Sequence, residues 1–186
     1  MQKENRRTKM TKMLFRTALV ELMQEKSFSK ITVKEICDRA DLNRTTFYKH
    51  YNDQEDILDE IESDLIERSI AYMKNVSREE GTVAMIEAYL HYVKENAVLF
   101  RVMFSGLGND NRIFSYTSNV LQHLQSNLPD YGTPVQEHYI LSFIMNGSFR
   151  IILTWIDSDF DIPERELARL IYTLCDSISD RFSAEQ

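Results

Sequence analysis

The chain is poor in the residues that cross-link or interrupt a fold. Its two cysteines, Cys37 and Cys175, are too few for a disulfide scaffold or a four-thiolate zinc site. Its five glycines and three prolines all lie beyond residue 80, which disfavours a sandwich of many turn-linked strands. The sequence starts without an apolar stretch of signal-peptide length and has no run of 18 apolar residues. We therefore expect a soluble cytoplasmic protein with no membrane contact.

The charge of the chain is divided unevenly along its length. The formal net charge is −7, yet residues 1–51 carry 12 Lys and Arg against 6 Asp and Glu. Residues 52–186 carry 10 basic residues against 23 acidic ones. A compact basic segment attached to an acidic body indicates a head that binds a polyanion such as nucleic acid, although an uneven scatter of solvated charges would give the same counts.

Apolar residues recur at helical spacing over residues 10–26, which predicts the first helix. Lys9, Lys12 and Arg16 fall at i, i+3 and i+7, so three cations line one face of this helix. Because the first 80 residues contain no glycine or proline, the helices there must be separated by capping residues instead.

Capping residues mark two short helices after the first one. Thr32 with Glu35 matches a capping box, in which the hydroxyl accepts from a backbone amide and the glutamate reaches back. The amides at this helix start would also suit a phosphate, although a purely structural cap explains Thr32 equally well. Asn43 can cap a third helix over 44–50, and a longer helix over 53–74 follows. Two short helices joined by a tight turn and braced by a helix in front form a helix-turn-helix.

Beyond Gly81 the pattern predicts four or five more helices, which makes the fold all-α. The segment 134–155 is apolar nearly all round, and a helix without a polar face is buried on two sides. In a chain of this size we expect the second side to be covered by another copy of the protein. The last helix starts near Pro163, because proline fits the first turn of a helix.

One face of the predicted third helix combines side chains suited to DNA. Arg44, Thr45, Tyr48 and Lys49 share this face, because residues at i, i+1, i+4 and i+5 cluster on a helix. Arginine makes two hydrogen bonds to guanine, threonine and lysine reach bases or phosphates, and a tyrosine hydroxyl suits a backbone phosphate. The alternative is an ordinary solvated helix face, but an exposed tyrosine between two cations favours the DNA-binding interpretation.

The segment ITVKEICDRADLNRTTFYKHYNDQEDIL, residues 31–58, closely resembles the N-terminal domain of the TetR/AcrR family of transcriptional regulators. GSFRIILTWIDSDFDIPERELARL, residues 147–170, also looks like the late part of that family's C-terminal domain. The positions that match the N-terminal family pattern are Thr32, Val33, Ile36, Ala40, Leu42, Asn43, Thr46, Phe47, Tyr48, His50, Tyr51 and Ile57.

Two positions depart from the family pattern. Asp41 occupies the turn position usually held by glycine, and aspartate can adopt the left-handed conformation at some cost. Gln54 stands where the family commonly has a lysine that touches phosphate, and its neighbours are acidic. A glutamine can donate a hydrogen bond but brings no charge, so we expect this contact to be weak. More of the electrostatic attraction to DNA must then come from the other cations, Lys9, Lys12, Arg44 and Lys49.

The resemblance implies an all-α homodimer with a helix-turn-helix DNA-binding domain over 1–52 and a larger ligand-binding and dimerisation domain over 53–186. It implies a ligand-responsive repressor of a near-palindromic operator, with heads about 34–36 Å apart or a multiple of that. A small-molecule inducer would act by binding the other head spacing more tightly, and helix 53–74 would transmit the change. The predicted DNA-contacting residues are Lys9, Lys12, Thr32, Asn43, Arg44, Thr45, Thr46, Tyr48, Lys49, His50 and Gln54.

The body offers candidates for a ligand pocket and for a dimer interface. An entry was expected at the loop Gly106–Gly108, beside Met103 and Phe104, although a plain core explains each pocket candidate as well. The pocket candidates are Tyr89, Tyr92, Phe100, Met103, Phe104, Tyr116, Tyr139 and Phe143. The last two helices, about 135–156 and 164–181, would form a four-helix bundle in the dimer. Its predicted residues are Ile144, Ile151, Ile152, Trp155, Leu167, Leu170, Ile171, Leu174 and Ile178.

Two other functions were compared with a DNA-binding regulator. The four histidines and two cysteines lie far apart without paired ligand spacing, so we expect no metal site, no cofactor and no enzyme activity. A coactivator of the same fold, which binds a partner regulator instead of DNA, would be expected to lose its cationic recognition face. Arg44 and Lys49 favour direct DNA binding, while Gln54 keeps the coactivator open.

Overall fold

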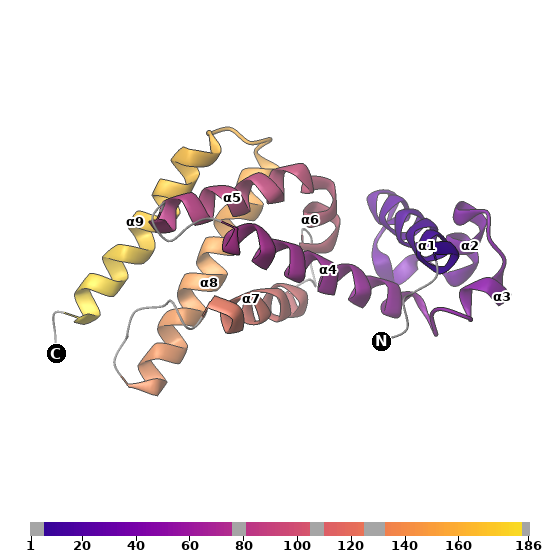
Figure 1. The fold of residues 1–186 in the computed structure, drawn as a ribbon, viewed down its shortest axis with the longest axis horizontal. Helices are drawn as coiled ribbons and strands as arrows, with labels where there is room; N and C mark the ends of the chain where they lie inside the picture. The colour runs from indigo at the N-terminus through magenta and orange to yellow at the C-terminus, as the bar shows by residue number, and fades with distance from the viewer. Residues whose placement is uncertain (1–5, 76–80, 105–109, 125–132, 184–186) are drawn as a thin grey trace. The chain divides into compact units, whose positions relative to one another are not determined.

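The computed structural model describes residues 6–75, 81–104, 110–124 and 133–183, and all regular structure in these ranges is helical (Figure 1). The all-α prediction is therefore confirmed for this part of the chain. The elements are α1 (Arg6–Glu25), the 3-10 turn η1 (Phe28–Lys30), α2 (Val33–Ala40), α3 (Arg44–Phe47), α4 (Gln54–Lys74), α5 (Gly81–Glu95), α6 (Ala97–Phe104), α7 (Asp110–Leu124), α8 (Pro134–Asp157) and α9 (Glu164–Ser183).

The chain divides into two compact units within α4, Met1–Leu65 and Ile66–Gln186, which we call the head and the body. We predicted the domain boundary after residue 52. The division falls later because the first turns of α4 belong to the head by packing and by charge. Ile57, Leu58 and Ile61 are buried, and Glu60 accepts a hydrogen bond from the Lys12 ammonium of α1 at 2.7 Å.

An aromatic cluster holds the head together. The side chains that α1 buries are Phe15, Ala18, Leu19 and Leu22. Phe15 meets Phe47 of α3 edge-on, with ring centroids 5.2 Å apart, and it also meets Tyr51 at 6.2 Å. Edge-to-face pairs of this kind add to the stability that ring burial already provides. Phe47 therefore fixes the short recognition helix α3 to the rest of the head.

The turn between α2 and α3 contains a left-handed aspartate. Asp41 has φ 52° and ψ 43°, as its place in the family pattern required, and the Leu42 amide donates to the Cys37 carbonyl at 3.0 Å. The predicted helix over 44–50 is shorter in the structure, because α3 ends at Phe47. The chain continues as a hydrogen-bonded turn, in which the His50 amide donates to the Phe47 carbonyl at 2.9 Å.

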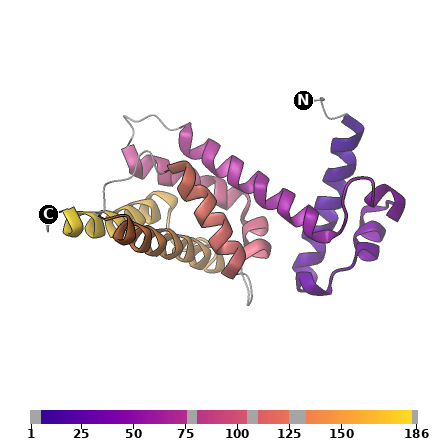
Figure 2. The same cartoon turned by 90° about the horizontal axis from the view of Figure 1, so that it is seen from below.

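In the body, α5 and α9 run side by side, as both views show (Figure 1, Figure 2). The turn that leads from α8 into α9 is closed by Trp155, whose indole NH donates to the Ile162 carbonyl at 2.8 Å. The Trp155 ring is buried and meets Phe160 edge-on at 4.8 Å. Asp159 and Phe160 both have left-handed backbone, with φ 53° and 61°. This compact turn sets the register between the last two helices.

Helix α8 is apolar on two faces, as predicted, but the faces differ in exposure. Its inner face is buried, whereas Val135, Tyr139 and Phe143 are exposed. Thr133 caps the helix in a capping box with Gln136. Among the described residues α8 is also the one helix long and apolar enough to cross a membrane, a criterion of length and composition that a packed helix of a soluble protein meets as well.

Candidate nucleic-acid interface

The recognition helix presents a cationic face over an aromatic anchor. Arg44, Thr45, Tyr48 and Lys49 are exposed, and the Tyr48 side chain is 60% accessible. Phe47 is fully buried beneath them, and its ring lies edge-on to Tyr48 with centroids 5.4 Å apart. The four side chains predicted to share this face are thus all exposed, and their contact with DNA stays a prediction. An anchored helix start with outward arginine, threonine and lysine suits the major groove of DNA.

Two of the predicted contact residues serve the helix itself. Asn43 Oδ1 accepts from the Thr46 amide at 2.8 Å and from the Thr46 hydroxyl at 3.0 Å. This cap fills hydrogen-bonding groups of both side chains, so their main role in the structure is to begin and orient α3. His50 is half-buried at the end of the turn after α3.

At the start of α2, Thr32 forms the predicted capping box with Glu35. The Thr32 amide and hydroxyl both donate to Glu35 Oε2, at 3.0 and 2.9 Å, and the Glu35 amide donates to Thr32 Oγ1 at 3.3 Å. Lys26 Nζ donates to the other Glu35 oxygen at 2.5 Å. The hydrogen bonds from Lys26 and then from Thr32 lower the pKa of Glu35 to about 2. A phosphate that approached this helix start would meet a carboxylate that is charged at neutral pH.

The cations along α1 are divided between two roles. Lys12 pairs with Glu60 at 2.7 Å and its ammonium lies 5.5 Å from the centre of the Tyr51 ring. Arg16 pairs with Asp64 at 2.5 Å. We predicted a DNA contact for Lys12, but the structure places its ammonium against an acidic side chain of α4, where it braces the head. Lys9 is exposed, which is compatible with its predicted contact.

The start of α4 is acidic and tightly capped. Asp53 Oδ1 accepts from the amides of Glu55 and Asp56, at 2.9 and 3.3 Å, and the Asn52 amide donates to Asp56 Oδ2 at 2.6 Å. These carboxylates stabilise the positive end of the helix dipole. They also oppose a phosphate beside the half-buried Gln54, so the weak contact expected there stays a prediction.

Sequence reasoning missed two lysines near the start of α2. Lys30 and Lys34 are exposed and flank Thr32 in sequence. The signal was available, because Lys26, Lys30 and Lys34 recur every four residues through this segment. Lys30 and Lys34 are better placed to meet a phosphate electrostatically than Lys12, whose ammonium is paired.

Six of the eight pocket candidates form a closed aromatic core in the body. These residues are Tyr89, Tyr92, Phe100, Met103, Phe104 and Tyr116, and each is buried. Tyr116 Oη lies 2.6 Å from Ser69 Oγ and 3.0 Å from Tyr89 Oη, which links α4, α7 and α5. Burial raises the pKa of Tyr116 and of Tyr89, so both phenols stay neutral. The loop Gly106–Gly108, the expected entry, lies outside the described residues.

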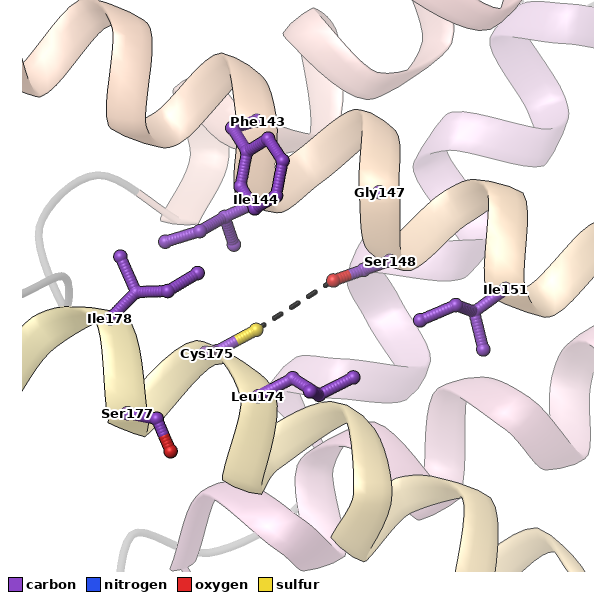
Figure 3. A pocket seen from close by; sticks show the side chains of 9 residues that line it. All are labelled: Phe143, Ile144, Gly147, Ser148, Ile151, Leu174, Cys175, Ser177 and Ile178. Carbon is purple, nitrogen blue, oxygen red and sulfur yellow. Dashed lines mark hydrogen bonds between the residues drawn. The ribbon is translucent and has the colours of Figure 1, made fainter.

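The other two pocket candidates, Tyr139 and Phe143, are each 70% exposed on α8. Phe143 lines an apolar pocket of the structure, as predicted, whereas Tyr139 is not among the residues that line it. This pocket lies between α8 and α9 and measures about 510 Å³ (Figure 3). Of the predicted interface residues, Ile144, Ile151, Leu174 and Ile178 line it.

The interface prediction needs correction at four residues. The side chains of Ile152, Trp155, Leu167 and Ile171 are buried by their own chain, so they face the core of the body and not a partner. The reason is that α8 and α9 each have two apolar stripes, and the sequence alone does not say which stripe is inside. Leu170 and Leu174, each 47% exposed, lie on the outer stripe of α9.

Comparison with known proteins finds a matching family for a segment of each unit. Residues 16–61 match the family described as "Bacterial regulatory proteins, tetR family", and residues 82–177 match "Transcriptional regulator C-terminal region". The chain is 23% identical over 166 residues to the HTH-type transcriptional regulator YxbF of Bacillus subtilis, covering 84% of this chain and 42% of that protein. It thus spans less than half the length of that relative.

Two further likenesses agree in fold. A transcriptional regulator of Haemophilus influenzae is 20% identical over 165 residues, which cover 82% of this chain and 78% of that protein. The crystal structure of a TetR regulator from Streptococcus agalactiae superimposes with a TM-score of 0.69 at 22% identity, over 91% of this chain and 96% of that one. These matches are to regulators, which confirms the expectation that the chain is not an enzyme.

Proposed function

The chain belongs to the TetR family of bacterial transcriptional regulators, and we propose that it acts as a homodimeric repressor on a near-palindromic DNA operator, where it responds to a small molecule. One observation carries the proposal: the exposed face of Arg44, Thr45, Tyr48 and Lys49 on a helix-turn-helix whose other side is anchored by buried Phe47. A coactivator that does not touch DNA would have no use for two outward cations, one on this helix and one in the turn that follows it.

Each exposed side chain of the recognition helix has a role that its chemistry supports. Arg44 lies at the start of α3, where a guanidinium reads the O6 and N7 acceptors of guanine. Tyr48 and Lys49 lie one turn later and suit backbone phosphates. Asn43 orients the helix by capping it. Apart from the weak contact expected at Gln54, DNA contacts in this proposal come from residues 1–52, while ligand and partner contacts come from residues 53–186.

The homodimer is supported by the outer stripes of α8 and α9. Together they carry exposed apolar side chains and an apolar pocket, which is the kind of surface that a stable interface covers. Twofold symmetry would set two heads about 34–36 Å apart, or a multiple of that, and so require a near-palindromic operator. A ligand changes operator affinity only by binding one head spacing more tightly than the other, and α4 contributes residues to both units.

Selection from random double-stranded DNA tests the proposal directly. The full chain should retain a near-palindromic sequence in the cytoplasmic salt range, and its affinity should fall steeply as salt rises. Failure to bind any duplex at low salt, or binding only when a second regulator is added, would contradict it and favour the coactivator.

Replacing Arg44 sharpens the assignment. Arg44→Ala should cost about 1–3 kcal/mol of operator binding and relax specificity at one base pair, measured by quantitative mobility shift on wild-type and mutated sites. Lys49→Ala is the matched control, because it should weaken all sequences alike and flatten the salt dependence. Equal losses on every sequence for Arg44→Ala would make Arg44 a phosphate contact instead.

A further inference from the structure

The carboxylate of Glu60 is where three segments of the head meet. Its Oε2 accepts from the Lys12 ammonium of α1 at 2.7 Å and from the Tyr51 hydroxyl at 3.3 Å. Its Oε1 lies 3.5 Å from the Arg16 guanidinium, one turn further along α1. Because a carboxylate accepts several hydrogen bonds at once, this one side chain of α4 is tied both to α1 and to the chain that leaves α3.

The Lys12 ammonium strengthens this contact, because it also lies 5.5 Å from the centre of the Tyr51 ring. A cation over an aromatic face is attracted to the ring, so the ammonium draws the ring and the carboxylate together. The Glu60 and Lys12 side chains are only 27% and 28% exposed. Salt screens a partly buried pair of charges less than a fully exposed one, so this contact persists at the salt concentrations of DNA-binding measurements.

Tyr51 connects the Glu60 carboxylate to the recognition helix. This helix, α3, has only the four residues Arg44–Phe47, and so short a helix does not hold its own orientation. The Tyr51 amide donates to the Phe47 carbonyl at 3.0 Å, and the two rings have centroids 5.8 Å apart. The exposed residues Tyr48 and Lys49 lie between Phe47 and Tyr51 in the chain. The orientation of residues 44–49 therefore depends on where Tyr51 is held.

We propose that Glu60 is a positioning residue for DNA recognition, which acts through Tyr51 to hold residues 44–49 in the orientation that reads the operator. The inference rests on the DNA binding proposed above and adds a residue of α4 that acts without touching DNA. Charge alone predicts a different result. An acidic side chain beside the cations of α1 weakens the attraction of the head to any duplex, so its removal would tighten binding to all sequences alike.

Glu60→Ala distinguishes the two roles when its binding to two duplexes is compared. One duplex is the sequence that the native chain selects from random DNA, and the other is a scrambled duplex of equal length and composition. Glu60→Ala should lower the ratio of the two affinities about tenfold, because displaced side chains lose base contacts while the attraction to phosphates remains. Fluorescence anisotropy at one salt concentration measures both affinities.

Asp64→Ala is the matched control for charge. Asp64 lies one turn further along α4 and pairs with Arg16 at 2.5 Å. Its loss changes the net charge by the same amount but leaves the hydrogen bond from Tyr51 to Glu60 in place, so the ratio should stay within about twofold of the native value. Tyr51→Phe keeps the ring and removes the hydroxyl, which should lower the ratio as well. Combined with Glu60→Ala it should cost less than the two separate losses together, because both variants remove the same hydrogen bond.

Hydrogen exchange tests the contact without DNA. The Tyr51 amide, which donates to the Phe47 carbonyl, reports how firmly the chain after α3 is held. In Glu60→Ala this amide should exchange about tenfold faster than in the native chain. The Ile36 amide of α2, which donates to the Thr32 carbonyl at 3.1 Å, should change by less than about twofold. If the Ile36 amide also exchanges much faster, the whole head has loosened, and Glu60→Gln replaces Glu60→Ala in both measurements.

The outcomes distinguish this role from the proposed function. An affinity ratio that stays unchanged in Glu60→Ala, or that falls equally in Asp64→Ala, would overturn the positioning role. A Tyr51 amide that exchanges at the native rate would overturn it as well. A native chain that selects no sequence would overturn the proposed function and the role in DNA recognition with it. The exchange rates would then still establish or refute that Glu60 holds the chain after α3.

Discussion

The head and the body use their polar side chains in different ways. In the head they cap short helices and pair across the surface, as Thr32 does with Glu35 and Asn43 with Thr46, at a separation of three residues. In the body a chain of hydroxyls is buried among aromatic rings, and it joins Ser69 to Tyr116, which is 47 residues away. Local patterns therefore describe the helix caps of the head well, whereas the buried hydroxyls of the body depend on contacts that only the fold brings together.

The largest expected effect concerns the buried aromatic cluster of the head. Phe47→Ala should lower the free energy of unfolding of the head by about 3–5 kcal/mol, because Phe47 is fully buried against Phe15 and Tyr51. Thermal unfolding followed by circular dichroism measures the loss. Tyr48→Ala at the adjacent exposed position should change stability by less than about 0.5 kcal/mol while weakening DNA binding. Similar losses for both variants would show that α3 is not anchored by Phe47.

In the body, removing a single buried hydroxyl should lower the stability of the fold. Tyr116→Phe leaves the Ser69 hydroxyl and the Tyr89 hydroxyl without their shared partner, so stability should fall by about 1–3 kcal/mol. The matched control is Tyr72→Phe, because the Tyr72 hydroxyl donates to Glu95 at the exposed surface at 3.2 Å. Denaturant unfolding of both variants checks the difference. If Tyr116→Phe left the stability unchanged, the hydrogen bonds of the buried hydroxyls would contribute nothing to it.

A smaller effect of opposite sign is expected in the turn before α3. Asp41→Gly should stabilise the head by about 0.5–1 kcal/mol, because Asp41 is held at φ 52° and glycine adopts that region without a Cβ clash. Asp41→Ala provides the contrast and should destabilise, since alanine adopts the left-handed region less readily than aspartate. If Asp41→Gly destabilises as well, the Asp41 side chain supplies a contact that outweighs its backbone conformation.

The smallest effect concerns pH and the exposed cluster around Glu35. Its pKa in the folded head is lowered from 4.5 to about 2, so its contribution to stability is complete above pH 4.5 and is lost as pH falls toward 2. Melting temperatures of the native chain and Glu35→Gln should therefore differ most above pH 5 and converge at acid pH. A constant difference across this range would show that the capping geometry, not the charge, is what Glu35 provides.

Much of the head follows from short-range rules. The capping box at Thr32 and the cap at Asn43 were predicted and appear in the structure, because both depend only on residues three apart. The left-handed backbone at Asp41 followed from its place in the family pattern. The pairing of Lys12 with Glu60 was not predicted, because it joins residues 48 apart that a stripe along one helix cannot reveal.

The body shows where such rules stop. Periodicity identified α8 and α9 as apolar, but each has two apolar stripes, and burial depends on neighbours distant in the chain. Ile152 and Trp155 consequently were assigned to the outside although they are buried. Tyr139 and Phe143 were predicted to line a ligand pocket; both are exposed, and of the two Phe143 borders the apolar pocket between α8 and α9. An aromatic residue at helical spacing marks an apolar surface, and only the fold decides what covers that surface.

The single tryptophan gives the two units separate optical signatures. Trp155 is buried in the body with its indole NH hydrogen bonded, whereas the fluorescent residues of the head are tyrosines and phenylalanines, without a tryptophan. Tryptophan emission therefore reports loosening of the α8–α9 turn and is silent when the head alone melts. Recording emission and ellipticity on the same heated sample would resolve whether the DNA-reading unit opens first, without any label attached to the chain.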